Sequence, residues 1–219
     1  MYPALGFPLA FLVIGILEKS LGDPFLPSKR FPSTTLFMVL VGPLLILNFQ
    51  ALLPYSEEHA AGWLFRVAPV RDLARVFTGV RRAFLISILL PLFLLMGVLL
   101  SWFWTPAHAF WHAAFGFILS YLFLGVAFLF YRGGFPFSQE PAKMTQTQQM
   151  TLAFLSMPLF GALFFLIYAL YRHPKWLVAA AIVLLIFGWG LNRAADRKAA
   201  RVTRRRLEGE LFAEIEDLS

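Results

Sequence analysis

The sequence predicts an all-α polytopic membrane protein with five to six transmembrane helices and a cytoplasmic amphipathic segment between the second and third. Hydrophobic residues make up 59% of the chain and charged residues only 14%. Soluble domains have about a quarter of their residues charged, so the deficit indicates that much of the surface faces lipid. Long uncharged runs, with arginines concentrated beside them, indicate the same fold class. The lack of cysteine excludes disulfides, thiolate metal sites and cysteine nucleophiles.

The uncharged runs define a transmembrane domain over residues 1–192. At about 1.5 Å per residue, about 20 helical residues cross a hydrocarbon layer of about 30 Å. The first run is at the lower limit of that length, so it either spans the membrane or forms a re-entrant or interfacial helix. The expected spans cover residues 2–17, 34–53, 83–104, 107–131, 151–171 and 176–192.

Prolines and glycines predict how these runs are connected. The glycine and three prolines of residues 21–33 are typical of a turn-rich connector. Gly42-Pro43 should kink the second span. Thr105-Pro106 is a tight corner that should join the third and fourth spans into a helical hairpin.

Residues 56–82 form the one long charged interval between hydrophobic runs, and they predict two amphipathic helices. Ser56 is a good N-cap, and the two glutamates that follow it complement the helix dipole. Pro69 ends this first helix and suits the first turn of a second one. The second helix has an apolar face and an opposite face of Arg71, Arg75, Thr78 and Arg82, which suits lipid head groups or an acidic partner.

The distribution of basic residues predicts the orientation of the chain. Most of the lysines and arginines outside the runs lie in residues 56–82 and in the tail. By the positive-inside rule these segments are cytoplasmic, as are both termini if the first run spans. If the first run does not span, the N-terminus lies outside. The net charge of +7 is explained by this topology, so we expect no nucleic-acid partner.

Residues 193–219 predict a charged cytoplasmic tail helix with a basic block followed by an acidic block. Asp196 is the one acidic residue among the arginines and lysines that open it. Apolar residues lie along one side of the acidic block. The tail therefore either docks onto another protein or continues out of the last span as a solvated helix.

Polar residues inside the expected spans are candidates for a substrate path. Asn48 and Gln50 place two amides near the cytoplasmic end of the second span, and Ser156 lies in the fifth. The amides could equally bond neighbouring helices.

His108 and His112 stand four residues apart on one helical face, a spacing that could hold a metal ion. No third ligand accompanies them in their segment, so interfacial hydrogen bonding is the expected role and metal binding the weaker alternative. No acidic residue lies inside the confident spans, and an intramembrane catalytic site needs such groups. We therefore expect no catalytic site and no cofactor in this chain.

The charged interval resembles a segment of the membrane subunits of ABC exporters of the type-2 permease class. The resemblance covers about residues 34–131, and the family's Gly-Lys-like ending is here Gly79 followed by Val80 and Arg81. The residues that carry it are Glu58, Gly62, Trp63, Leu64, Phe65, Arg66, Pro69, Val70, Gly79 and Arg82.

The resemblance implies a permease subunit that forms a membrane path and is driven by a separate ATP-binding subunit, which would hold the ATP and Mg²⁺. It also implies a second permease copy or homologous half, with this chain as a compact half or the C-terminal part of a longer or split permease. The coupling helix would dock through Glu58, Trp63, Leu64, Phe65 and Arg66, with Pro69 as a rigid elbow.

Two alternatives stay open. The first is a non-transporting membrane adaptor or regulator that binds anionic lipid and a partner protein. The second is a membrane-embedded lipid-modifying enzyme that uses the face of His108 and His112.

Overall fold

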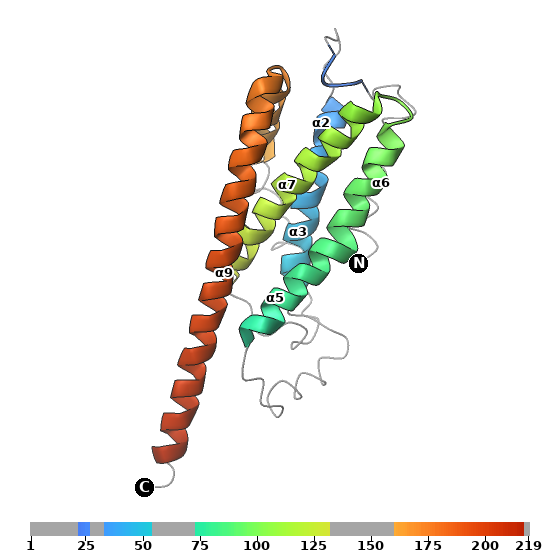
Figure 1. Ribbon diagram of the computed structural model, residues 1–219. Helices are drawn as coiled ribbons and strands as arrows, with labels where there is room; N and C mark the ends of the chain where they lie inside the picture. Colours follow the sequence, from blue (N-terminus) through green and yellow to red (C-terminus); the bar gives the residue numbers. More distant parts are fainter. Residues whose placement is uncertain (1–21, 27–32, 54–72, 132–159, 217–219) are drawn as a thin grey trace, which may run out of the picture.

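The computed structural model describes residues 22–26, 33–53, 73–131 and 160–216. Within these ranges the chain is helical apart from turns and short connections, as the sequence predicts (Figure 1). The expected first span, the first amphipathic helix with all six docking residues from Glu58 to Pro69, and Ser156 lie outside the described residues.

The span expected over residues 34–53 consists of two helices, α2 (Ser33–Val39) and α3 (Val41–Leu52). They meet at Leu40, just before the Gly42-Pro43 pair at which the sequence predicts a kink. Pro43 has no N–H to donate, and its ring crowds the carbonyl four residues earlier. The break therefore falls in the turn that precedes the proline.

Residues 73–100 form one continuous helix of three segments, α5 (Leu73–Phe84), the π-helical turn η2 (Leu85–Leu89) and α6 (Leu90–Leu100). Pro91 accounts for the π-helical turn, because widening the helix relieves the clash between the proline ring and a carbonyl of the preceding turn. The N–H of Leu90 accordingly donates to the carbonyl of Leu85. The third expected span is thus continuous with the second half of the charged interval.

α7 (Pro106–Phe130) is the central helix and corresponds to the span predicted over residues 107–131. It starts after an extended Thr105, with Pro106 in its first turn, as the predicted corner requires. It packs against α2, α3, α6 and α9. Glycine allows the closest of these approaches: a Cβ on Gly42 of α3 would overlap the hydroxyl oxygen of Ser120 in α7.

α9 (Pro174–Glu216) is a single helix that joins the last expected span to most of the charged tail. Figure 1 shows its C-terminal part projecting well beyond the lower end of α5. A shorter apolar helix, Phe160–Tyr171, precedes it. The turn between them is closed by the N–H of Trp176, which donates to the carbonyl of His173 at 2.8 Å.

Three helical stretches in the described part of the chain are long and apolar enough to cross a membrane: Arg75–Leu100, Pro106–Phe130 and Lys175–Arg201. Two shorter apolar helices, Thr35–Gln50 and Phe160–Tyr171, accompany them. Large apolar side chains are exposed on the outside of the long helices, among them Ile86 at 60% and Phe187 at 65%. These features are compatible with a membrane protein whose outer surface faces lipid.

Candidate functional site

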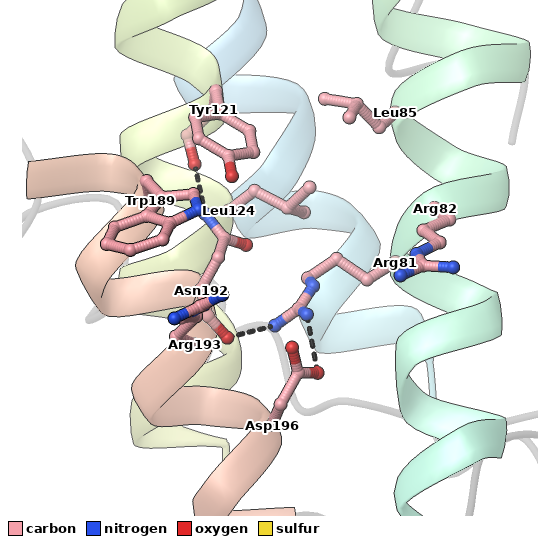
Figure 2. Close-up of a pocket in the computed structure, with 9 residues that line it drawn as sticks. All are labelled: Arg81, Arg82, Leu85, Tyr121, Leu124, Trp189, Asn192, Arg193 and Asp196. Atoms are coloured by element: carbon pink, nitrogen blue, oxygen red, sulfur yellow. Dashed lines mark hydrogen bonds and ion pairs between the residues drawn. The ribbon is translucent and has the colours of Figure 1, made fainter. Parts of the chain in front are cut away.

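Arg81 is the centre of a polar cluster between α5 and α9, and it is only 7% exposed. One guanidinium nitrogen donates to Oδ1 of Asp196 at 2.6 Å, and another donates to the carbonyl of Asn192 at 3.1 Å. The hydroxyl of Thr78 donates to the same carboxylate oxygen at 2.6 Å. We call Thr78, Arg81, Asn192 and Asp196 the arginine cluster. Figure 2 shows Arg81, Asn192 and Asp196. The arginine cluster ties the start of the α5–α6 helix to the middle of α9.

The neighbours of Arg81 explain why a buried cation is tolerated. A buried charge is costly unless it is paired and hydrogen-bonded, and here Asp196 supplies the opposite charge. The ring of Phe128 in α7 lies 5.9 Å from the guanidinium carbon, a distance that allows a cation–π contact.

Asn192 connects α9 to the central helix α7. Its amide nitrogen donates to the carbonyl of Tyr121 at 3.1 Å and to the carbonyl of Gly188 at 2.7 Å. Because both partners are acceptors, they fix the orientation of the amide, and Oδ1 has no hydrogen-bond partner among the described residues. Gly125 permits this approach, since a Cβ there would lie 2.9 Å from the amide nitrogen.

Farther along α9, the side chain of Lys198 caps the C-terminal end of the central helix α7. Its ammonium group donates to the carbonyls of Leu129 at 2.7 Å and Tyr131 at 3.2 Å. These carbonyls lie at the C-terminal end of α7, which carries the negative end of the helix dipole and favours a cation. α9 is therefore held against α5 and α7 by polar contacts at Asn192, Asp196 and Lys198.

A pocket of about 360 Å³ opens beside the arginine cluster. Figure 2 shows α9 on one side and α5 on the other, with α7 running behind α9. Arg82 and Arg193 are exposed at its opposite sides. The pocket is lined by Arg81, Arg82, Leu85, Tyr121, Leu124, Trp189, Asn192, Arg193 and Asp196.

A second polar cluster lies at the other end of the bundle, where the connector before α2 meets the start of α7. Nδ1 of His108 is 2.6 Å from Oδ2 of Asp23. The other oxygen of Asp23 accepts the N–H of Phe25 at 3.0 Å, which stabilises the turn. The ring of Phe25 lies 4.7 Å from that of His108 and 5.1 Å from that of Tyr171.

His112 is fully buried in this second cluster. Its Nδ1 is 2.6 Å from the hydroxyl of Tyr171, and the indole of Trp104 packs edge-on against its ring at 5.3 Å. Its Nε2 has no hydrogen-bond partner among the described residues. We call Asp23, His108, His112 and Tyr171 the histidine cluster.

The structure brings His108 and His112 to one end of the bundle but gives each its own partner. Among the residues that the structure describes, no group of three or more histidines and carboxylates could hold a metal ion. Asp23 and Tyr171 were not foreseen as partners of the histidines, because residues distant in sequence give no local signal of their contact. The groups assembled here are of the kind that can hold or transfer a proton.

The two predicted amides have different surroundings. Gln50 donates to the carbonyl of Ala127 in α7 at 3.0 Å, so it bonds a neighbouring helix. Asn48 is exposed and donates to the carbonyl of Leu44 in its own helix at 2.8 Å. Neither lines the pocket beside the arginine cluster.

Arg81, Asn192 and Asp196 were not singled out as a site from the sequence. The available signal was Asp196 itself, a lone acid in the basic run that opens the tail. Chemically, the guanidinium groups, the carboxylate and the amide around the pocket suit the binding of an anionic group that also carries a hydrogen-bond donor. Comparisons with protein-family models, with curated proteins and with solved structures found no match.

Proposed function

We propose that the chain is the membrane subunit of an ABC-type exporter, moved by a separate ATP-binding subunit that docks on the segment before α5. This proposal includes the five to six spans and the cytoplasmic orientation of residues 56–82. It rests on the resemblance carried by Glu58, Trp63 and Arg66. The observation that supports it most is the helix over residues 73–100, which begins directly after the docking segment.

A continuous helix is the element that such a mechanism requires. A displacement at the start of α5 is carried along the whole helix, because α5, η2 and α6 share one uninterrupted axis of hydrogen-bonded turns. The arginine cluster links α5 to α9, so the two helices respond together. The proposed role of Arg81 is to transmit this movement.

The test is co-expression of the full chain with candidate ATP-binding subunits. Replacement of the docking contacts in the double variant Trp63→Ala/Arg66→Glu should abolish both association and stimulated ATP hydrolysis. Arg81→Leu/Asp196→Leu should leave association intact and reduce substrate movement, because docking and transmission use different residues. Failure of every ATP-binding subunit to associate with the wild-type chain would overturn the exporter and leave the lipid-binding adaptor.

A second candidate, a membrane-embedded lipid-modifying enzyme, is favoured by the contact between His108 and Asp23. A histidine next to a carboxylate is a common acid–base pair. Loss of an activity on lipid in a folded His108→Ala/His112→Ala variant would support this function over the exporter. Retention of full transport in the same variant would argue against it.

A further inference from the structure

The pocket beside the arginine cluster lies where two helices change from apolar to charged. On the α5 side, Arg81 and Arg82 are followed by the uncharged run that begins at residue 83. On α9, the apolar run ends at Leu191, directly before Asn192 and Arg193. The contact between Arg81 and α9 brings both transitions to one level. In a membrane that level is the head-group layer, where charged side chains meet lipid phosphates.

The charges around the pocket favour an anion. Asp196 neutralises Arg81 through the 2.6 Å contact. Arg82 and Arg193 are exposed at the sides of the pocket, and among the described residues neither makes an ion pair. The guanidinium of Arg193 lies over the ring of Trp189 at 4.2 Å, which holds one cation next to the pocket.

The wall of the pocket also contains an acceptor without a partner in the described part of the chain, Oδ1 of Asn192. Asn192 is 6% exposed, and its Oδ1 has no partner among the described residues although its amide nitrogen has two. In Figure 2 the amide oxygen points away from Tyr121 toward the side from which Arg81 enters. A buried acceptor without a partner is costly, so a ligand with a donor at this point is favoured.

Apolar surface adjoins the pocket on its membrane side. Trp189 lines the pocket and is 52% exposed. Leu185, Ile186 and Ile182 lie four, three and seven residues before it and are 49%, 62% and 55% exposed. This spacing places them on the same face of α9, so an acyl chain can follow the helix away from the pocket.

We propose that this pocket binds the head group of one anionic phospholipid that carries a hydroxyl, of the phosphatidylglycerol type. Arg82 and Arg193 neutralise the phosphate, the hydroxyl donates to Oδ1 of Asn192, and one acyl chain lies along Trp189 and Ile186. Lipid binding at this pocket does not require that the chain be an exporter.

Native mass spectrometry of the full chain in detergent, titrated with phosphatidylglycerol or phosphatidylcholine, tests the site. The wild-type chain should retain one phosphatidylglycerol, and Arg82→Gln/Arg193→Gln should weaken its binding about tenfold or more, as expected for losing charge-assisted hydrogen bonds. Arg197→Gln/Arg201→Gln removes two exposed charges from α9 outside the pocket and should retain the lipid. Equal binding by wild type and the pocket variant, or equal loss in both variants, would overturn the proposal.

Two further ligands test which part of the head group the pocket recognises. Phosphatidylmethanol has the same charge as phosphatidylglycerol but no hydroxyl, so it should bind about threefold to tenfold more weakly, the value of one hydrogen bond. Equal affinity would overturn the role of Asn192. Inorganic phosphate at millimolar concentration should not displace the lipid. Displacement would show that the pocket takes a soluble phosphate compound and would overturn the lipid assignment.

Discussion

The arginine cluster and the histidine cluster lie at opposite ends of the same bundle. They differ in how their buried polar groups are paired. Around Arg81 a formal charge is buried, and three helices contribute partners to it and to Asn192. Around His112 the buried contact joins two groups that can both be neutral. The carboxylate of Asp23 in the same cluster is also buried, with its side chain 7% exposed, and its partners are His108 and the N–H of Phe25. The pair around Arg81 consists of two formal charges, whereas His108 can bond Asp23 as a neutral imidazole, so the loss of a partner should cost more at Arg81.

The two clusters also suit different roles. The arginine cluster links the long α5–α6 helix to α9 and adjoins a pocket, so it can transmit movement or bind an anion. The histidine cluster links the connector at Asp23 to α7 and to Tyr171, so it fastens the opposite end of the bundle. The following substitutions test whether the two ends differ in this way.

Asp196→Leu should have the largest effect. It leaves Arg81 buried without its counter-charge, which costs about 3 kcal/mol of unfolding free energy, the lower end of the range for broken buried pairs. The lower end applies because the side chain of Asp196 is 40% exposed. Denaturant unfolding in micelles, followed by circular dichroism, measures this loss.

The matched control is Arg81→Leu/Asp196→Leu. Removing both side chains leaves no unpaired charge, and only the neutral hydroxyl of Thr78 and the carbonyl of Asn192 lose a partner. The double variant should therefore recover most of the stability lost in Asp196→Leu. A loss of less than about 1 kcal/mol in the single variant, the range of exposed ion pairs, would contradict the buried pair.

Gly125→Ala should destabilise the contact between α7 and α9 by about 2 kcal/mol, as expected for overpacking a tight interface. The new Cβ would lie 2.9 Å from the amide nitrogen of Asn192 and 3.0 Å from Cβ of Leu191. Gly190→Ala is the control, because nothing lies within 4 Å of a Cβ there and alanine favours a helix. Thermal unfolding of both variants separates crowding from helix propensity, and equal midpoints would contradict the close approach.

Tyr171→Phe should cost about 1–2 kcal/mol, because Nδ1 of His112 loses its partner while it stays buried. Tyr171→Phe/His112→Leu should be less destabilised than the sum of the two single variants, since both polar partners are gone. The unfolding free energies of the four proteins form a double-mutant cycle. A coupling energy near zero would show that the 2.6 Å contact contributes nothing.

His108→Ala should have a smaller effect than Asp196→Leu, about 1–2 kcal/mol, the range for a buried polar group that loses a partner. The side chain of Asp23 is 7% exposed and loses His108, but it keeps the hydrogen bond from the N–H of Phe25. The same unfolding assay applies. A loss above about 2 kcal/mol of unfolding free energy would be close to the loss expected for Asp196→Leu. It would contradict the proposed difference between the two ends.

Much of the fold was predictable because hydrophobic length and proline position are local properties. The helical corner at Thr105-Pro106 and the long apolar runs 83–104 and 107–131 follow from twenty-residue windows of sequence. The break at Leu40 was displaced from the predicted kink because a proline acts on the carbonyl four residues earlier.

The candidate sites were less predictable. The spacing of His108 and His112 identified one helical face but not the partners that approach it. Arg81 was one of several arginines in residues 56–82, and the helical pattern placed its exposed neighbour Arg82, not Arg81, on the basic face. That pattern did not identify Asp196 and Asn192 of α9, the partners of Arg81.

The sequence by itself determined that this protein is helical, apolar on its surface and charged in definite places, because these properties depend on composition and on short periodic patterns. Only the tertiary structure decided which charges meet. Arg81 and Asp196 are 115 residues apart in the chain, and their 2.6 Å contact exists because α5 packs directly against α9. Electrostatic pairing of this kind depends on distances of a few ångströms, which a pattern of residue types does not contain.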